Sequence, residues 1–344
     1  MLGGGLAGLC AAFELRNKGY RVLAVLEAQD RTGGRVRTVR SGLANGQYVE
    51  LGATRIPDSH PFTLGYMEQF GLEKVQFSSG DGLYYLKGKP PFVHVDGDPW
   101  PADVLPGLTG EDATLGADSI VLKYDRFSEI INPASPEYLG DPNAAGWPTG
   151  YAATLTPLSL IEYLRRHGAT DDAILIDRAI NGSEIYSDGA LFWLATDVVD
   201  ATWDKTFAVK GGNDRLSRAF TAALGDIVKY RCVATGIEQG SRGARVTYTH
   251  RGRSRAIDAD YVVSALPFST LRDLRIRPAL PADKGEVIRK LRMMPVSRCC
   301  LQTKSRFWQR RGIGGLKVAR TDTAIDRFWD HTNVQEIGAS VVHR

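Results

Sequence analysis

The apolar positions at the start of the chain follow first a helical and then a strand-like spacing. A broad apolar face recurs over residues 6–18, at Leu6, Leu9, Cys10, Phe13 and Leu15. Basic residues and then Gly19 follow, which suits the end of a helix. The next run, YRVLAVLE at 20–27, is apolar over the length of a strand, as in a parallel strand buried on both faces. The pattern therefore predicts a helix over 6–18 and a buried strand after it.

The middle of the chain has helical spacing in two places. We expect one helix that Thr156 caps, with Pro157 at its first position and apolar side chains from Leu158 to Leu164 on one face. TDDAILIDRAI at 170–180 predicts the next helix. The stretch 88–150 is rich in Pro, Gly and Asp, so we expect long loops there.

Composition removes several classes of function. The 344 residues suffice for two domains, and the net charge of +4 is too small and too dispersed to indicate nucleic acid. No apolar run has membrane-spanning length. The histidines and the four cysteines have no metal-ligand spacing, so no metal site is expected, and the cysteines are interpreted as buried free thiols. Motifs for acyl transfer and for P-loop chemistry are also missing from the sequence.

The first loop carries a dinucleotide pattern. Gly3, Gly5 and Gly8 fit G-x-G-x-x-G at the start of the predicted helix, and Glu27 ends the predicted strand about twenty residues later. Such glycines let backbone N–H groups, here those of Leu6 and Ala7, approach a pyrophosphate, while the acid accepts from a ribose hydroxyl. The alternative is an ordinary glycine-rich turn with a surface glutamate.

A second glycine motif follows the strand directly. EAQDRTGGRVRT places Arg31, Gly33, Gly34 and Arg35 as R-x-G-G-R, after Ala28. Paired glycines allow another close approach to phosphate, and arginine adds charge and donors. The alternative is a loop with exposed arginines.

From the first loop through GGRVRT, the sequence resembles the GG-doublet flavoproteins of the amine oxidase family, and among these the L-amino acid oxidases. KGGNDRL at 210–216 is similar to the family's second glycine turn, which leads into a helix at about 214–224. A strand YRCVATGIEQ, a hairpin of ARVTYTH and SRAIDA, and a buried strand DYVVSALP follow, and then LRMMPVSRCCLQTKSRFW resembles a strand and an FW pair of the substrate domain. The likeness is loose between about 60 and 205.

The resemblance implies an α/β fold with two interleaved domains. A Rossmann-like FAD-binding domain, made of a βαβ dinucleotide unit and a β-meander, would take residues 1–60 and 206–270. An α+β substrate domain would take 61–205 and 271–344. FAD would contact residues of the two glycine motifs, of GATR at 52–55 and the backbone of one later valine: Gly3, Gly5, Leu6, Ala7, Gly8, Glu27, Ala28, Arg31, Gly34, Arg35, Gly52, Ala53, Thr54, Arg55 and Val233.

The tetrad GATR indicates the substrate. In the family its fourth residue faces the substrate, and amine oxidases tend to carry an aromatic residue there. L-amino acid oxidases and tryptophan 2-monooxygenases carry arginine, whose planar fork can bind the α-carboxylate with two hydrogen bonds. Arg55 is therefore the expected carboxylate clamp; the alternative is an ion pair with a nearby acid such as Asp58.

The implied reaction is oxidative deamination of an L-amino acid by hydride transfer from Cα to flavin N5, which yields a 2-oxo acid, ammonia and hydrogen peroxide, with dioxygen as the oxidant. Arg298 is the expected catalytic residue, because it stands where many members carry a lysine near N5. Arginine there could alter the reactivity with oxygen, so a dehydrogenase that uses another acceptor stays open; the alternative is an arginine without a role. The alternatives are a monoamine or polyamine oxidase, a tryptophan 2-monooxygenase-like enzyme, and an inactive fragment. A homodimer and the localisation are left open.

Both ends of the sequence differ from the family pattern. Only ML precedes the first glycine loop, and no segment similar to the family's closing GxxxxAGE occurs in 309–344. We therefore expect a piece of a longer oxidase that, expressed alone, holds FAD weakly.

Overall fold

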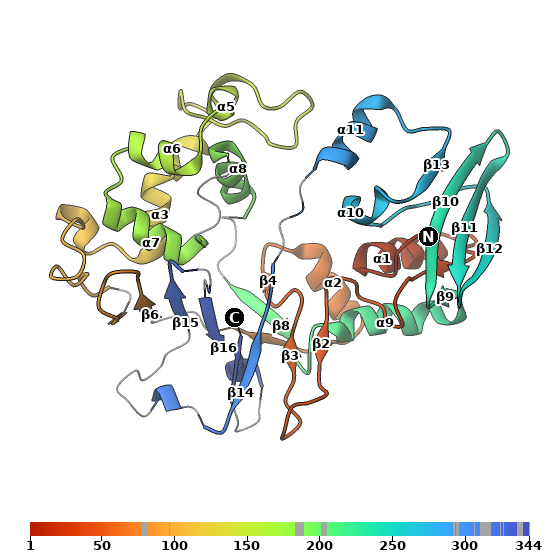
Figure 1. Cartoon of the computed structure of the whole chain (residues 1–344), viewed down its shortest axis with the longest axis horizontal. Helices are drawn as coiled ribbons and strands as arrows, with labels where there is room; N and C mark the ends of the chain where they lie inside the picture. The colour runs from red at the N-terminus through yellow and green to blue at the C-terminus, as the bar shows by residue number, and fades with distance from the viewer. Residues whose placement is uncertain are drawn as a thin grey trace. The chain divides into compact units, whose positions relative to one another are not determined.

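The computed structural model describes residues 1–77, 82–95, 97–182, 189–200, 205–291, 293, 296–305, 307–309, 318–323, 325, 327–335 and 340–343. The chain forms two compact units (Figure 1). Unit 1 consists of Met1–Ile56, His60–Val75 and Phe207–Arg298, and unit 2 of Pro57–Ser59, Gln76–Thr206 and Cys299–Arg344. The chain passes from one unit to the other within the strands β4 (Ile56–Pro57), β5 (Lys74–Gln76) and β8 (Thr206–Val209).

Unit 1 begins with the predicted βαβ arrangement. Leu2 forms parallel bridges to Leu26 on one side and to Ser264 on the other. Helix α1 (Leu6–Asn17) connects Leu2 to strand β1 (Val25–Leu26), which pairs in parallel with β9 (Val228–Lys229). The dinucleotide loop therefore lies at the end of a parallel strand position and at the start of a helix, as G-x-G-x-x-G requires.

The other described elements of unit 1 include a sheet, a short ribbon and four further helices. The sheet has the order β12-β11-β10-β13, with β10 (Cys232–Gly240), β11 (Gly243–His250) and β12 (Arg253–Ala259) as an antiparallel meander and β13 (Arg275–Arg277) parallel to β10. Strands β2 (Thr38–Val39) and β3 (Val49–Glu50) form the ribbon. The helices are α2 (Pro61–Gln69), α9 (Asp214–Leu224), α10 (Phe268–Leu271) and α11 (Ala282–Lys290), and the 3₁₀ turn η3 (Gly225–Ile227) follows α9.

An apolar core holds helices α1, α2 and α9 to strand β1. Leu9 and Ala12 of α1, Val25 of β1 and Phe220 of α9 are buried in it. The ring of Phe13 lies edge-on to that of Phe220, with 5.5 Å between the centroids. This cluster fixes the helix that begins at the dinucleotide loop.

The expected helices over 6–18 and 214–224 and the meander are confirmed, but two strands differ from the sequence prediction. YRVLAVLE contributes only Val25–Leu26 as β1, and DYVVSALP contributes only the bridge at Ser264. The side chain of Tyr261, expected in a buried strand, is 90% exposed. The physical reason is that a parallel strand needs a partner along its whole length, and here the central position between these two segments holds only Met1 and Leu2.

The unit boundaries also differ from the predicted domain boundaries. Residues 60–75 belong to unit 1 because Met67 of α2 is buried in the core with Leu9 and Phe220. Residues 271–298 belong to it because β13 extends the meander sheet and α11 follows. The assignment of FAD to one unit and of substrate to the other stays a prediction.

Unit 2 combines a sheet with a helical cluster. Its sheet has the order β14-β17-β16-β15-β6-β7, from β6 (Gly82–Tyr85), β7 (Phe92–His94), β14 (Cys300–Thr303), β15 (Val318–Thr321), β16 (Arg327–Asp330) and β17 (Ser340–His343). The helices are α3 (Ala117–Tyr124), α4 (Phe127–Ile130), α5 (Gly150–Leu155), α6 (Leu160–Arg166), α7 (Asp171–Asn181) and α8 (Ala190–Asp200). The 3₁₀ turns are η1 (Gly110–Ala113), η4 (Phe307–Gln309) and η5 (His331–Val334). A core that runs from Tyr84 to Leu194 holds the helices together.

Three predictions for unit 2 need correction or lie partly outside the described residues. The stretch 88–150 contains helices α3 and α4, because Ile120 and Tyr124 supply an apolar face that the Pro and Gly content hides. The helix expected from Thr156 instead starts after Ser159, which forms a capping box with Glu162. TDDAILIDRAI is helical as predicted. Parts of LRMMPVSRCCLQTKSRFW, at 292, 294, 295 and 306, lie outside the described residues.

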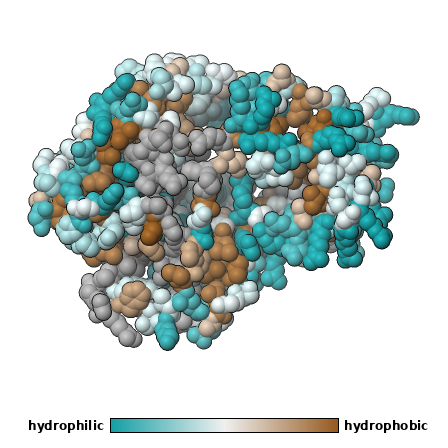
Figure 2. All heavy atoms as spheres, in the orientation of Figure 1, coloured by the Kyte–Doolittle hydropathy of each residue, from teal (hydrophilic) through white to brown (hydrophobic). Residues whose placement is uncertain are grey.

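Hydrophilic and apolar side chains are distributed unevenly over the visible surface. Hydrophilic side chains are dense over α9 and the neighbouring part of unit 1 in Figure 2, with apolar side chains interspersed elsewhere on that face. In the described part of the chain, no helix has the length and apolar character needed to cross a membrane.

All four cysteines are free, but Cys232 alone is buried and Cys299 is exposed, so the expectation of buried thiols is wrong for the other three.

Candidate functional site

The first glycine loop leaves the start of α1 open. Gly5 is the N-cap residue and supplies no side chain, so no side-chain cap occupies the first N–H groups of the helix, those of Leu6, Ala7 and Gly8. A Cβ on Gly5 would meet only the Cα of Gly34, at 4.0 Å, whereas a Cβ on Gly8 would lie 2.0 Å from the carbonyl oxygen of Gly3. The loop is thus tightly packed at Gly8, whereas the N-terminus of the helix at Gly5 is accessible.

Glu27 lies against this loop. Its side chain is 7% exposed, and its two carboxylate oxygens accept from the backbone N–H groups of Gly4 at 2.7 Å and Gln29 at 2.8 Å. Each oxygen keeps a further lone pair for another donor. The carboxylate therefore connects the end of β1 to the glycine loop and can also accept from a ribose hydroxyl, while the adjoining Ala28 is exposed.

The second glycine motif contacts the first. The N–H of Gly33 donates to the carbonyl of Gly4 at 2.9 Å, and Gly5 and Gly33 form a parallel bridge. Gly33 and Gly34 have φ of +102° and +57°, so both adopt the left-handed conformations that glycine tolerates. The structure brings the two predicted motifs into one cradle.

The two arginines of R-x-G-G-R differ. Arg31 donates to the carbonyls of Thr32, Gly34 and Val36, so it holds its own loop in shape. Burial is the main reason that the pKa of Arg31 is lowered from its ordinary value. The side chain of Arg35 is exposed. Of the two, Arg35 is the better placed to reach a phosphate.

The segment Gly52–Arg55 lies against the second motif. A Cβ on Gly52 would be 1.9 Å from the carbonyl oxygen of Arg35, and Ala53 donates to that same oxygen at 3.0 Å. Only glycine fits at this contact. The side chain of Arg55, at the end of the segment, is exposed.

Asn213 holds this segment in place, although it is not among the residues predicted from the sequence. Its Nδ2 donates to the carbonyls of Ala53 at 2.9 Å and Thr54 at 3.0 Å, and its Oδ1 accepts from the N–H of Val209 at 2.8 Å. Asn213 is 4% exposed. The signal was present in KGGNDRL, where an asparagine follows a glycine pair at the start of a helix.

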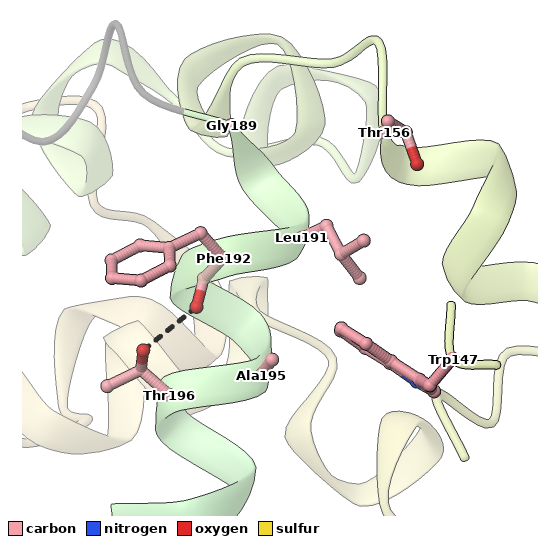
Figure 3. A pocket seen from close by; sticks show the side chains of 7 residues that line it. All are labelled: Trp147, Thr156, Gly189, Leu191, Phe192, Ala195 and Thr196. Atoms are coloured by element: carbon pink, nitrogen blue, oxygen red, sulfur yellow. Dashed lines mark hydrogen bonds between the residues drawn. The ribbon is translucent and has the colours of Figure 1, made fainter. Parts of the chain in front are cut away.

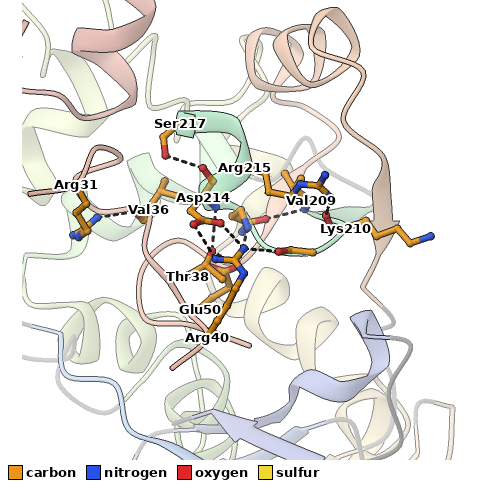
Figure 4. A network of polar contacts seen from close by, with 12 residues as sticks. Arg31, Val36, Thr38, Arg40, Glu50, Val209, Lys210, Asp214, Arg215 and Ser217 are labelled. Atoms are coloured by element: carbon orange, nitrogen blue, oxygen red, sulfur yellow. Dashed lines mark hydrogen bonds and ion pairs between the residues drawn. The ribbon is translucent and has the colours of Figure 1, made fainter. Parts of the chain in front are cut away.

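Buried Glu50 belongs to the same network (Figure 4). Its carboxylate accepts from the N–H of Asn213 at 2.8 Å and from the hydroxyl of Thr38 at 2.9 Å. Burial raises the pKa of Glu50 above its ordinary value. Nearby, Arg40 forms an ion pair with Asp214 at 2.7 Å. The network joins the β2–β3 ribbon to the start of α9.

Arg298 also contacts the predicted flavin segment. Its Nη1 donates to the carbonyl of Glu50 at 2.8 Å, and also to the carbonyl of Gly52 and the hydroxyl of Thr54. A role of Arg298 beside a flavin stays a prediction. In the structure, the guanidinium of Arg298 holds the segment 50–54 through these hydrogen bonds.

Val233 joins the site through the backbone. The N–H of its neighbour Cys232 donates to the backbone carbonyl of Glu27 at 2.8 Å, which places the start of β10 beside the end of β1. The side chain of Val233 is 47% exposed. Thus the predicted residues from 3–8, 27–35, 52–55, 233 and 298 all lie in unit 1, and hydrogen bonds join the segments 3–8, 27–35 and 52–54 and Arg298.

The geometry fits a dinucleotide. It offers an uncapped helix N-terminus, two glycine backbones in contact, an acid at the end of β1 and open space at Gly5. These are the groups that bind the pyrophosphate and the ribose of a dinucleotide. Among the described residues, no group of three or more His, Cys, Asp or Glu side chains is arranged to hold a metal ion.

A separate apolar pocket lies within unit 2. Figure 3 shows Leu191 of α8 facing Trp147, and the volume is about 520 Å³. The described residues that line it carry no charge: Trp147, Thr156, Gly189, Leu191, Phe192, Ala195 and Thr196. They supply no charged side chain to pair with a carboxylate.

Two relatives that are named as oxidases of L-amino acids are similar to this chain in sequence. The chain is 28% identical over 351 residues to an L-amino-acid oxidase of Demansia vestigiata and covers 65% of that protein. It is 29% identical over 335 residues to the flavin-dependent L-tryptophan oxidase of Lentzea aerocolonigenes and covers 67% of it. The chain thus spans about two thirds of the length of these relatives.

Solved structures agree on the fold. Putrescine oxidase bound to putrescine has a TM-score of 0.78 at 22% identity, with 99% of this chain and 73% of that chain covered. Cyclohexylamine oxidase of Brevibacterium oxydans has a TM-score of 0.76 at 22% identity, with the same coverage. The family model of flavin containing amine oxidoreductases matches residues 6–335. The chain therefore belongs to the flavin containing amine oxidoreductase family, and its cofactor is FAD.

Proposed function

We propose that the protein to which this chain belongs oxidises L-amino acids with FAD, and that Arg55 binds the substrate's α-carboxylate. The products are a 2-oxo acid, ammonia and hydrogen peroxide, formed from the amino acid, dioxygen and water. The single observation that carries the proposal is an exposed arginine at the end of a segment held rigidly beside the dinucleotide cradle.

The support for Arg55 combines chemistry and position. Guanidinium stays charged at any working pH and can offer two parallel hydrogen bonds to a carboxylate. Asn213 and Arg298 both contact the backbone of the segment that ends at Arg55, so this arginine extends from a preorganised base. The relatives named above as L-amino-acid and L-tryptophan oxidases act, by their names, on substrates with an α-carboxylate.

The chain's own residues would hold the cofactor in a defined way. The N–H groups of Leu6, Ala7 and Gly8 would bind the pyrophosphate, Glu27 the adenosine ribose, and the backbone of Val233 the adenine. The segment 52–54 would lie beneath the flavin ring. FAD, when bound, supplies the two-electron acceptor, and the protein supplies orientation and exclusion of water.

Arg298 serves this arrangement as a positioning residue. Its Nη1 contacts with Glu50, Gly52 and Thr54 hold the backbone from which Arg55 extends. Arginine retains its proton throughout the working pH range. Any proton that leaves the substrate amine must therefore pass to another acceptor, such as solvent.

The test is a substrate panel for Arg55→Met. We expect kcat/KM for L-amino acids to fall by a few orders of magnitude, since removing one partner of a desolvated charge pair costs on the order of 3–5 kcal/mol. Amines without a carboxylate should be little affected. Peroxide and ammonia release measure both, and Arg55→Lys should recover part of the loss because it keeps one charge without the fork.

Arg253→Met is the matched control. Arg253 is an exposed arginine of β12 in the same unit and should tolerate the change. An equal loss for amino acids and amines in Arg55→Met would make Arg55 a scaffold residue. Wild-type turnover of amines but not of amino acids would favour an amine oxidase instead.

A further inference from the structure

A basic pocket lies in unit 1, between strand β9 and the turn that joins β11 to β12. Its volume is about 720 Å³, which is within the range of sites for small ligands. Four cationic side chains line it: Lys229, Arg231, Arg251 and Arg255. Its described lining includes no residue of the first glycine loop, of the Gly33–Gly34 pair or of GATR, so the pocket is separate from the dinucleotide cradle.

Strand register brings these cations together from distant parts of the sequence. Lys229 ends β9, two residues before Arg231. Cys232, the next residue, lies opposite His250 in the β10–β11 pair, so the turn at Arg251 begins beside Arg231. Charges that are dispersed along the sequence therefore meet in one pocket.

Arg255 extends from the face of the meander that carries the core. Val246 of β11 lies opposite Ile257 of β12, and Tyr248 lies opposite Arg255. Opposite residues of an antiparallel pair lie on one face of the sheet, and so do residues two apart on a strand. Val246 is buried in the core cluster, so Tyr248 and Arg255 share its face. The apolar face of the meander thus ends in a basic edge at this pocket.

Three of the four cations have no anionic partner within the part of the chain that the structure describes. There, the side chains of Lys229, Arg251 and Arg255 form no ion pair and no hydrogen bond. Arg231 pairs at 3.6 Å with Asp30, the one acid of the described lining, and both side chains are largely exposed. Cations that gather in one pocket raise the local positive potential, which attracts anions from solution.

The backbone holds two of these arginines in a conformation that arginine rarely adopts. The φ angle is +55° at Arg231 and +49° at Arg251. Among the described non-glycine residues, positive φ occurs otherwise only at Asn45 and Arg126. Glycine adopts this conformation without a steric penalty, so arginine at both positions indicates that its side chain has a role here.

From the volume of the pocket, its four cations and its single acid, we propose that it binds a small polyphosphate anion, either inorganic or carried on a nucleoside. Phosphate oxygens accept several hydrogen bonds and match the planar fork of arginine. The rings of Tyr230 and Tyr248, which also line the pocket, would stack on a base in the nucleoside form. A bounded pocket suits a small anion better than a long nucleic acid, which needs cations over an extended surface.

The experiment measures the binding of sodium tripolyphosphate, ATP and citrate to the full chain by isothermal titration calorimetry, without divalent cations. Arg251→Gly removes one charge at a position where glycine suits the backbone, so Tm should not fall. A double variant adds Arg255→Gln. Arg242→Gln is the matched control, because Arg242 is an exposed arginine in the turn at the other end of the same meander and does not line this pocket.

We expect tripolyphosphate or ATP to bind the original chain saturably. Arg251→Gly should weaken this binding by about three- to fivefold, the range of one exposed ion pair, and the double variant by about tenfold or more. Added salt should weaken it too, since salt screens exposed charges. Arg242→Gln should match the original chain.

Tighter binding of ATP than of tripolyphosphate would assign the nucleoside form, and equal or weaker binding of ATP would assign the inorganic form. Three results would overturn the proposal: no saturable binding, binding that both pocket variants leave unchanged, or equal weakening by Arg242→Gln. Citrate bound as tightly as tripolyphosphate would also contradict it, because the pocket would then take any polyanion. The readout is binding at a pocket apart from Arg55 and the cradle, so it does not depend on the proposed function.

Discussion

Replacing Asn213 by alanine should loosen the segment that carries Arg55. The substitution removes three side-chain hydrogen bonds, with Ala53, Thr54 and Val209, at a site that is 4% exposed. Each is worth a net 0.5–1.5 kcal/mol, so unit 1 should lose about 3 kcal/mol of unfolding free energy. The backbone N–H of residue 213 can still donate to Glu50, which limits the loss.

The assay must report on unit 1 alone. All six tryptophans lie outside it, so tryptophan fluorescence follows unit 2. Hydrogen exchange of the α9 amides at several urea concentrations gives the free energy for unit 1. FAD titration of the same protein should show an affinity at least about fivefold weaker, since the segment 52–54 is no longer held.

Asn132→Ala is the matched control. Asn132 is exposed, and its side chain accepts one local bond from Ala134 at 3.0 Å. We expect it to change neither the α9 exchange nor FAD binding. If the unfolding free energies of unit 1 in Asn213→Ala and Asn132→Ala differ by less than about 1 kcal/mol, the hydrogen bonds of Asn213 do not hold the segment and the reasoning is refuted.

Three further predictions concern single residues. Gly8→Ala should disrupt the first loop and weaken FAD binding, because its Cβ would lie 2.0 Å from the carbonyl oxygen of Gly3. Gly65→Ala in α2 is the control: its Cβ meets nothing within 4 Å, so it should stabilise the protein by about 0.5–1 kcal/mol. Urea titration measures the stability of both variants, and flavin absorbance measures their FAD binding. Glu27→Gln should weaken FAD binding by roughly 1.5–3 kcal/mol, and unchanged flavin retention after desalting would contradict its role. Burial, together with the carboxyls of Asp177 and Asp197, raises the pKa of Asp125 well above its usual value, so the folded state holds the proton. The stability of the folded protein should therefore fall as pH rises from about 4 toward that raised pKa. Asp125→Asn should flatten this part of a Tm–pH profile, and an unchanged slope would count against an effect of the three carboxyls.

Local pattern predicted those parts of the fold that neighbouring residues determine. Helices α1, α7 and α9 and the meander followed from apolar spacing, glycines and turn residues. The strand at 260–267 did not form as predicted, because pairing depends on a partner far away in the sequence. Likewise, Ser159 rather than Thr156 starts α6, since the reciprocal bonds with Glu162 decide between two plausible caps.

For the site, the motifs predicted which segments meet but not what holds them. The spacing of Gly3, Gly8 and Glu27 implies one loop, and the structure adds the bond between Gly33 and Gly4. The roles of Asn213 and Arg298 depend on carbonyls about 160 and 246 residues earlier, which no local pattern reveals. The sequence also could not show that Arg31 turns back onto its own loop.

The discontinuous unit 1 has a consequence for synthesis of the chain. Leu2 cannot form its bridge to Ser264 until residue 264 has left the ribosome, which at 5–20 residues per second takes roughly 13–50 s. Throughout that time the dinucleotide loop lacks its second neighbour, and the segment 76–206 of unit 2 is made before that neighbour appears. The segment that carries the dinucleotide loop therefore waits for a partner made long after it, and the parallel pairing at Leu2 is a late step in the folding of unit 1.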